Sequence, residues 1–433
     1  MQSLELIPLL KSYQEFIQSS SDFIPRNICV PLQGSKIIFI SGPGHAGKTS
    51  FLKYIASTLE GTKIYIDFKD NKIQPLVCKN LQVLKEAAAE ICNQNSEKKD
   101  PEEKEIERVY YFLDEIQSIP QWEKWIEELS GEADGIFITS RGPLKENSLL
   151  NFESMAKTVK LLPFSFKEYL LIKSGRVPNP NLLTPSRRDE VLCTFLQYFE
   201  NGGFPEIAKK GNPDLARNYF DEIIEKKESA ENIQAAKGLR KLTIFLISNM
   251  ASEYSLDTLK KVSGIEDKEP LEALLRYLEN EFLLYRVPKL DDSSETEGKT
   301  DTSHKIYIGD TGFFKAVYPN YPDSLGLRFE NLVFLELQRQ GKEIFYYKDQ
   351  NECDFLIKEK DNQKISAAIQ TSIYFGSPSG KEREFLGLLS AMEKYELDEG
   401  LILTMDDEEI LDIEIDGLKK KIIIKPVWKW MLE

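Results

Sequence analysis

The 433-residue chain is too long for a single hydrophobic core, so its length alone predicts about three domains. Hydrophobic residues make up 41% and charged residues 29%, which is ordinary for a soluble globular protein. The formal net charge of -15 argues against wholesale binding of nucleic acid or anionic membranes, although a local cluster of lysine and arginine can still bind phosphates.

Cysteine usage and the first residues bear on the compartment. The five cysteines are scattered without a CxxC pair and the chain has two histidines, which argues against a zinc site or a disulfide framework and favours a reducing cytoplasm. The start of the chain lacks the basic residues and long apolar stretch of a secretion signal, and no apolar run approaches about 18 residues. We therefore expect a cytoplasmic protein with no membrane partner.

The first third of the chain alternates apolar, strand-like segments with amphipathic or polar ones. This alternation is typical of an α/β domain with a largely parallel sheet. Five segments are predicted to be strands: residues 36–41, 63–68, 108–115, 135–140 and 158–162. A polar, charged stretch at 93–107 is predicted to be a solvated loop or helix end.

The pattern turns helical from about residue 185. One predicted helix buries a stripe formed by Leu239, Leu242, Leu246 and Met250. A second is predicted to end at Gly264, and a third buries Leu271, Leu274, Leu275 and Leu278. Three helices followed by two strand-like segments predict a winged helix, with the polar stretch 291–303 as its wing tip. After residue 327, an amphipathic helix and several short strands predict a compact α+β unit.

Residues 42–49 read GPGHAGKT and match the phosphate-loop pattern G-x-x-x-x-G-K-[ST]. The pattern lies between a predicted strand and a predicted helix, where loop N–H groups and the helix N-terminus favour a bound phosphate. Lys48 is predicted to reach the β- and γ-phosphates of ATP, and the Thr49 hydroxyl to coordinate Mg²⁺. The predicted nucleotide-contacting residues of this segment are Gly42, Gly44, Ala46, Gly47, Lys48, Thr49 and Ser50.

The apolar strand at 110–113 leads directly into Asp114 and Glu115. Asp114 is predicted to lie near the Mg²⁺ water shell, because a buried strand holds it at the carboxyl edge of the sheet. Glu115 suits a general base that polarises the attacking water. The adjacent glutamate favours water, rather than a kinase-type acceptor, as the nucleophile.

Polar residues also end the strand at 135–140. Thr139 or Ser140 is either a polar sensor of the γ-phosphate and the attacking water, or an ordinary transition from strand to loop. We interpret the neighbouring Arg141 as a surface cation, with a charge-stabilising role within the same chain as the alternative.

Short motifs along the chain together resemble one protein family. They are GPGHAGKT (42–49), FLDEIQ (112–117), ITS (138–140), LLPFSFKEYL (161–170), GGFPE (202–206), KIYIGDTG (305–312) and PVWKWML (426–432). In their order and spacing the chain is similar, over nearly its whole length, to prokaryotic AAA-like ATPases of unknown function that carry a C-terminal restriction-endonuclease-like domain. The resemblance implies an ASCE-type P-loop core with strand order 5-1-4-3-2.

The resemblance and the patterns together predict four domains: a P-loop ATPase domain (1–175), a helical lid (176–236), a winged helix (237–320) and a nuclease-like domain (321–433). By motif, the resemblance assigns phosphate and Mg²⁺ contacts to Lys48 and Thr49, the Walker B acid to Asp114 and the base to Glu115. It also makes Gly203 and Pro205 candidates for the adenine side of the nucleotide, with a plain turn as the competing interpretation.

The chain departs from the family pattern at two places. The family commonly has arginine and glutamine where this chain has Gly44 and His45. Its fourth strand commonly ends in Thr-Gly-Ser, where this chain has Thr139, Ser140 and Arg141. Neither departure touches the Lys–Thr pair of the phosphate loop, but both leave the γ-phosphate sensor open.

Charge argues against DNA binding by the third helix of the predicted winged helix. Residues 266–281 contain six acids and two bases: Glu266, Asp267, Glu269, Glu272, Glu279 and Glu281 against Lys268 and Arg276. Because such a helix repels phosphates, we favour protein docking or coupling to the lid over readout of a DNA groove.

The nuclease-like tail is predicted to be degenerate. Its family uses an acid on the first helix and an Asp…(Glu/Gln)-x-Lys hairpin to bind Mg²⁺ and activate water. Glu330 and Asp354 stand in suitable places, but Gln370 is neutral and Ser372 replaces the lysine. The alternative is an active nuclease that relies on Lys358, Lys360 or Lys364.

The sequence thus predicts a Mg²⁺-dependent enzyme that binds ATP and hydrolyses it slowly to ADP, coupling nucleotide state to rearrangement of its appended domains. Two alternatives remain: a nucleotide-dependent scaffold for a protein partner, with little turnover, and an ATP-regulated DNA nuclease. No arginine stands out as a finger for a neighbouring subunit.

Overall fold

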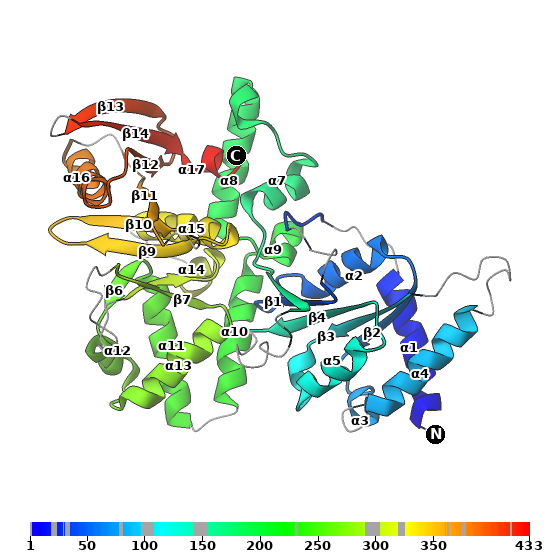
Figure 1. Cartoon of the computed structure of the whole chain (residues 1–433). Helices are drawn as coiled ribbons and strands as arrows, with labels where there is room; N and C mark the ends of the chain where they lie inside the picture. Colours follow the sequence, from blue (N-terminus) through cyan, green and yellow to red (C-terminus); the bar gives the residue numbers. More distant parts are fainter. Residues whose placement is uncertain are drawn as a thin grey trace. The chain divides into compact units, whose positions relative to one another are not determined.

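The computed structural model describes residues 2–18, 24–28, 30, 35–77, 81–96, 108–142, 152, 154–229, 233–290, 304–318, 325–359, 361, 363–373, 378–415 and 418–433. The chain folds into two compact units, Met1–Leu162 and Pro163–Glu433 (Figure 1). None of the described helices combines the length and the apolar character needed to cross a bilayer.

The first unit is built on a five-stranded parallel sheet with the order β2-β3-β4-β1-β5. Its strands are β1 (Ile37–Gly42), β2 (Thr62–Asp67), β3 (Val109–Asp114), β4 (Gly135–Arg141) and β5 (Ala156–Lys160). Its helices are α1 (Gln2–Gln18), α2 (Lys48–Thr58), α3 (Gln74–Val77), α4 (Leu81–Ser96), the 3₁₀ turn η2 (Ile116–Ser118) and α5 (Trp122–Ser130). The five predicted strands lie within two residues of these bounds, and both the α/β class and the strand order are confirmed. In the predicted loop or helix end at 93–107, α4 ends at Ser96, and residues 97–107 lie outside the described residues.

Side chains of each strand alternate between the two faces of this sheet. On β1, Ile37 and Phe39 pack into one core with α4 and α5, whereas Ile38 and Ile40 pack into another with α2. Burial on both faces explains why the strands are apolar throughout rather than alternating with polar residues. Because β3, β4 and β1 are parallel neighbours, their carboxyl ends lie side by side at one edge of the sheet.

The second unit begins with helices and a small antiparallel sheet. The helices are α7 (Phe166–Ser174), the 3₁₀ turn η4 (Pro180–Leu182), α8 (Pro185–Asn201), α9 (Pro205–Lys210), α10 (Asp214–Glu228), α11 (Ile233–Ser248), α12 (Leu256–Ser263), α13 (Lys268–Asn280) and α14 (Gly312–Val317). The sheet, in the order β6-β8-β7, consists of β6 (Ser252–Tyr254), β7 (Leu284–Pro288) and β8 (His304–Ile308). All eight predicted stripe residues are buried, although α11 ends at Ser248 and Met250 follows it in a turn. Gly264 caps α12 in the left-handed conformation. The predicted wing tip at 291–303 lies outside the described residues.

The rest of the second unit is a six-stranded mixed sheet in the order β13-β14-β12-β11-β10-β9. Its elements are α15 (Leu325–Arg339), β9 (Glu343–Lys348), β10 (Glu352–Lys358), β11 (Ile365–Ser372), α16 (Pro378–Lys394), β12 (Glu399–Thr404), β13 (Glu409–Ile415), β14 (Leu418–Pro426) and α17 (Val427–Trp430). β9, β10 and β11 are antiparallel, while β11, β12 and β14 are parallel. A bridge between Lys289 and Tyr346 links the end of β7 to β9.

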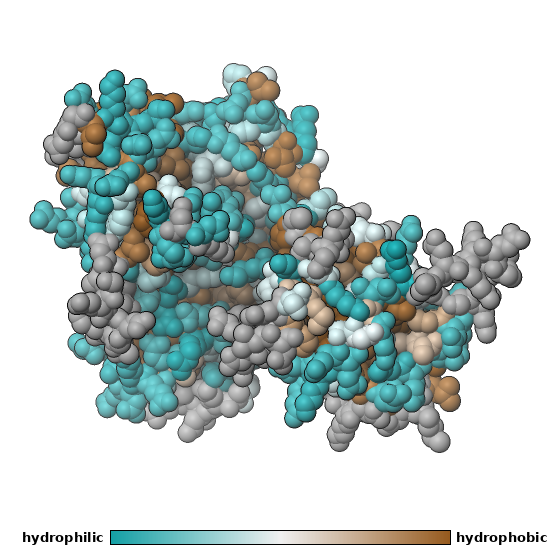
Figure 2. All heavy atoms as spheres, in the orientation of Figure 1, coloured by the Kyte–Doolittle hydropathy of each residue, from teal (hydrophilic) through white to brown (hydrophobic). Residues whose placement is uncertain are grey.

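The exposed large apolar side chains are scattered among the described residues. The most exposed are Leu4, Leu182, Ile410 and Leu418. Figure 2 shows a predominantly hydrophilic face in both units. Singly exposed apolar residues of this kind are normal on a protein surface and do not mark a binding site.

Candidate nucleotide site

The GPGHAGKT segment forms a tight loop between β1 and α2. Gly42 is the last residue of β1, and Lys48 is the first of α2. His45 (φ 62°) and Gly47 (φ 91°) have left-handed backbone conformations, and Arg26 Nη1 donates to the Ala46 carbonyl at 2.9 Å. The first N–H groups of an α-helix have no partner within the helix, so this loop and the start of α2 form a cradle suited to phosphate oxygens.

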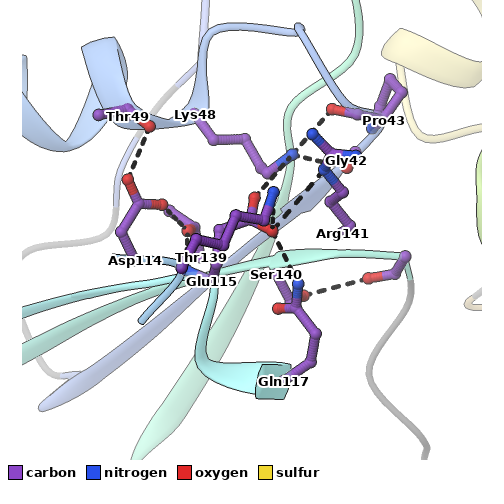
Figure 3. Close-up of polar contacts among 12 residues, drawn as sticks. Gly42, Pro43, Lys48, Thr49, Asp114, Glu115, Gln117, Thr139, Ser140 and Arg141 are labelled. Atoms are coloured by element: carbon purple, nitrogen blue, oxygen red, sulfur yellow. Dashed lines mark hydrogen bonds and ion pairs between the residues drawn. The ribbon is translucent and has the colours of Figure 1, made fainter. Parts of the chain in front are cut away.

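Lys48 is buried beneath this loop, with its side chain 5% exposed. Its ammonium donates to the carbonyls of Gly42 (3.0 Å) and Pro43 (2.8 Å) and lies 4.0 Å from Glu115 Oε1 (Figure 3). Burial lowers the pKa of Lys48 to about 8, although the charge of Glu115 opposes this shift. A phosphate would replace weak carbonyl contacts with a charged partner.

Asp114, at the end of β3, is the centre of a buried hydrogen-bond network. Its Oδ2 accepts from Thr49 Oγ1 at 2.6 Å, and its Oδ1 accepts from the Thr139 hydroxyl (Figure 3). Oδ2 also accepts from the Tyr65 hydroxyl at 2.9 Å. The Asp114 side chain is therefore fixed next to the Thr49 hydroxyl. A carboxylate and a hydroxyl placed together are hard oxygen ligands that suit Mg²⁺.

Glu115 follows β3 and has a left-handed backbone (φ 59°), which is uncommon for a residue other than glycine. Its Oε2 lies 2.9 Å from Lys69 Nζ and 3.7 Å from Arg141 Nε, and accepts from Gln117 Nε2 at 2.8 Å. Burial opposes ionisation of this carboxyl, but Lys48, Lys69 and Arg141 outweigh it and lower the pKa of Glu115. A strained, cation-held carboxylate at the edge of the sheet is typical of a functional position.

The two polar residues at the end of β4 serve different purposes. The Thr139 hydroxyl is completely buried; it donates to Asp114 and accepts from the Glu115 backbone N–H at 3.0 Å. Ser140 Oγ donates to the Gly142 carbonyl at 3.1 Å. Thr139 therefore positions the acidic pair, and its direct contact with a γ-phosphate stays a prediction.

Arg141 is not the surface cation that the sequence favoured. Its side chain is 19% exposed, and a Cβ placed on Gly44 would lie 3.3 Å from Arg141 Cζ. The guanidinium thus lies against the phosphate loop and beside Glu115. The correction follows from the strand order: β4 is the direct neighbour of β1, so the residue that ends β4 lies beside the loop that follows β1.

Sequence reasoning missed three residues of this site: Arg26, Tyr65 and Lys69. Lys69 lies just beyond β2, the neighbour of β3, so the implied strand order was the one signal that places it near Glu115. Tyr65 could not be identified as a site residue from the sequence, because it belongs to an apolar strand and is 2% exposed. Of the predicted loop residues, Ser50 is exposed on α2.

Gly203 and Pro205 lie in the second unit, where a local role accounts for the glycine. The Gly203 N–H donates to Asp310 Oδ2 at 2.8 Å, and its carbonyl accepts from the Phe164 N–H at 2.7 Å. Pro205 is the first residue of α9. Burial raises the pKa of Asp310 to about 6, against the bonds from Gly203 and Gly312. The GGFPE and KIYIGDTG motifs thus pack on each other, and contact of Gly203 or Pro205 with adenine stays a prediction.

This packing predicts a large stability difference between two glycine-to-alanine variants. Gly202 has φ 78° and ψ -173°, and a Cβ there would lie 1.7 Å from Asp310 Oδ1. Gly211 has a similar φ of 67° but nothing within 4 Å of an added Cβ. We expect Gly211→Ala to cost about 1–2 kcal/mol for backbone conformation alone, and Gly202→Ala to cost clearly more. Urea unfolding checks this; equal costs would show that the Asp310 contact contributes nothing.

Comparison with known proteins agrees with the geometry of the first unit. Residues 34–170 match a family described as "AAA domain", and residues 193–327 match a "domain of unknown function" (DUF8612). The chain is 28% identical over 435 residues to the uncharacterized protein MJ1544 of Methanocaldococcus jannaschii, covering 96% of this chain and 92% of that protein. An uncharacterized protein of Haemophilus influenzae is 26% identical over 59% of this chain and 64% of its own length.

Among solved structures, the Walker-type ATPase PABY2304 of Pyrococcus abyssi aligns with a TM-score of 0.41 and 14% identity, covering 66% of this chain and 92% of that chain. The AAA domain match spans all five strands and the GPGHAGKT loop. The parallel sheet in the order β2-β3-β4-β1-β5 fits a P-loop NTPase α/β fold, and this part of the chain matches the AAA domain family.

Proposed function

We propose that the chain binds ATP with Mg²⁺ in the first unit and hydrolyses its β–γ phosphoanhydride slowly with water. The observation that carries this proposal is the meeting of Lys48, the Thr49–Asp114 pair and Glu115 at one edge of a single sheet. A phosphate loop alone binds nucleotide. A carboxylate 4.0 Å from the loop lysine adds a group able to activate water.

The residues present fit a magnesium ion bound together with ATP. Thr49 and Asp114 would hold it, and when bound it would neutralise phosphate charge and orient the phosphates. The donors are two oxygens that already lie 2.6 Å apart, with Tyr65 and Thr139 fixing the carboxylate from the other sides.

The side chains of the chain itself supply the remaining chemistry. Lys48 exchanges its loop carbonyls for phosphate oxygens, and Glu115 polarises water. Since three cations lower the pKa of Glu115, it is a weak base while they hold it, and this supports slow turnover. Arg141 leaves Glu115 to stabilise the charge that develops on the phosphates.

The experiment that tests this function follows phosphate release by the full-length chain from ATP with Mg²⁺ and with EDTA. Release that depends on Mg²⁺ and is lost in Asp114→Asn supports the proposal. ATP binding without release of phosphate favours the second candidate below. Absence of ATP binding would contradict the proposal.

Arg141→Ala is expected to slow phosphate release by about 10²–10³-fold, the usual cost of one donor to transition-state charge. ATP affinity should change much less, because Lys48 and the loop remain. Arg108→Ala, an exposed arginine at the other end of β3, is the matched control. Steady-state rates at saturating ATP check this; an unchanged rate would show that Arg141 has no role in hydrolysis.

A second candidate function is a nucleotide-dependent scaffold with little turnover. The observation that favours it is that Lys69, Arg141 and Gln117 all contact the Glu115 carboxylate, so the carboxylate is occupied by these partners instead of water. Pull-downs of the full chain with ATP, ADP and no nucleotide separate the candidates. A partner set that does not change with nucleotide would exclude the scaffold.

For the second unit we propose a winged helix followed by a nuclease-like fold, both rearranged by the nucleotide state of the first unit. Support for the winged helix comes from the sequence α11-β6-α12-α13-β7-β8 and its sheet order. Two acids of α13 contact the hairpin: Arg286 of β7 pairs with Glu272 at 2.9 Å and with Glu279 at 2.8 Å. An acidic helix tied to its own hairpin supports docking to protein over binding to DNA.

A further inference from the structure

A buried lysine joins three carboxyl groups in the second unit. Lys305, on β8, has a side chain that is 3% exposed. Its ammonium lies 2.9 Å from Glu330 Oε1, 2.6 Å from Glu352 Oε1 and 3.7 Å from Asp354 Oδ1. Glu330 belongs to α15, and the other two acids belong to β10. One ammonium group therefore connects the three-stranded sheet to the six-stranded sheet.

The electrostatics of this cluster match a lysine that serves as counter-ion. Burial alone would lower the pKa of Lys305, but the surrounding acids and Tyr307 outweigh burial and raise it well above its ordinary value. Burial and the charge of Asp354 raise the pKa of Glu330 to about 8. Three carboxyl groups thus surround one ammonium within 4 Å.

The cluster coincides with the place where the sequence predicted metal ligands, so its fit to a divalent ion can be tested. Glu330 Oε1 already accepts from Lys305 and from the Tyr307 hydroxyl at 2.7 Å. Asp354 Oδ2 accepts from Thr371 N at 2.9 Å and from Thr371 Oγ1 at 2.6 Å. Gln370, in place of a third acid, accepts from the Asp354 N–H at 3.2 Å and donates to Glu384.

These donors do not fit a divalent metal while the Lys305 ammonium lies among them. No three histidine, cysteine, aspartate or glutamate side chains converge on a possible metal position anywhere in the part of the chain that the structure describes. Of the lysines in the alternative of an active nuclease, Lys358 lies over the Phe345 ring, and residue 360 lies outside the described residues. The cation present among the acids comes from β8, outside the nuclease-like fold.

We infer that the Lys305 ammonium is the resident cation of the Glu330–Glu352–Asp354 cluster, in the place of a divalent metal. It makes the six-stranded domain independent of metal and unable to cleave nucleic acid, and it fastens β8 to α15 and β10. A cavity of about 670 Å³, lined by Glu330, Glu352, Asp354 and Gln370 among others, borders the cluster. A small ion therefore has access to these acids once the lysine is gone.

The test measures Mn²⁺ binding to the full chain without nucleotide, by calorimetry and by the shift of the thermal unfolding midpoint. Asp354→Asn identifies binding at the cluster, as opposed to binding near Asp114. We expect wild type to bind no Mn²⁺ at the cluster, so Asp354→Asn should leave its Mn²⁺ binding unchanged. Lys305→Met should bind Mn²⁺ at least about tenfold more tightly than wild type.

Lys348→Met is the matched control. Lys348 is 43% exposed and contacts Glu352 at 3.2 Å and Glu253 at 3.0 Å, so its loss removes a charge at the rim without vacating the centre. It should gain no Mn²⁺ affinity. A folded Lys305→Met that also gains none would overturn the inference.

The wild-type comparison decides the matter even if Lys305→Met does not fold. Mn²⁺ binding by wild type that Asp354→Asn abolishes would overturn the inference, because the cluster would then hold metal beside Lys305. Plasmid cleavage with Mn²⁺ by wild type, lost in Asp354→Asn, would overturn it as well and would make Lys305 a nuclease lysine. Absence of both supports it.

Discussion

Glu115→Gln is expected to stop ATP turnover while ATP binding persists. The substitution keeps the size of the side chain but removes the carboxylate that polarises water, a contribution worth about 10²–10⁴-fold in rate. It also removes the negative charge that Lys48, Lys69 and Arg141 surround. Because a negative charge beside the loop is lost, the site becomes more cationic, and affinity for ATP should be maintained or increased. Phosphate release and calorimetric ATP binding on the same preparation measure both effects.

Glu127→Gln is the matched control for this variant, since Glu127 is an exposed acid on α5 of the same unit. It should hydrolyse ATP at the wild-type rate. If Glu115→Gln also released phosphate at the wild-type rate, Glu115 would not be the base. Its left-handed backbone and cation contacts would then be structural.

Lys48→Ala is expected to abolish detectable ATP binding. Lys48 is the cation buried beneath the loop, and charged hydrogen bonds to phosphate contribute about 1.5–3 kcal/mol each, so affinity should fall by about 10²-fold or more. Lys124→Ala, an exposed lysine on α5, is the control and should bind ATP normally. Calorimetric titration with ATP and Mg²⁺ compares the two.

The pH dependence of wild-type binding gives the same residue a second readout. Burial lowers the pKa of Lys48 to about 8, so the free protein loses this charge as pH rises through that value. ATP affinity should therefore weaken above about pH 8 in wild type. Unaltered ATP affinity in Lys48→Ala would show that nucleotide does not bind at this loop.

The parallel sheet and its loop were predictable because both depend on local pattern. Buried strands such as 36–41 are apolar runs in the sequence, and a glycine-rich turn between a strand and a helix is compatible with few structures other than a phosphate loop. The strand order came from the family resemblance, not from the strands themselves. It was also the information needed to place Arg141 beside Gly44, and the surface interpretation of Arg141 failed because that neighbour relation was not used.

Contacts between segments that are distant along the chain could not be predicted from the sequence. Lys305 and Asp354 are 49 positions apart and belong to different sheets, and no periodicity links them. Motif spacing pointed only to replacement lysines at 358–364, because it describes neighbours along the chain. Tyr65 is similar: its hydroxyl reaches Asp114 from inside a strand whose pattern indicates only burial.

The most direct test of the central claim is a single-turnover measurement with full-length wild type in excess over ATP, with Mg²⁺ present. This design removes product release from the rate and reports hydrolysis by the site itself. The arrangement of Lys48, Thr49, Asp114 and Glu115 predicts slow but complete conversion of bound ATP to ADP and phosphate, absent in Glu115→Gln. Bound ATP that stays intact in wild type over many hours would contradict it.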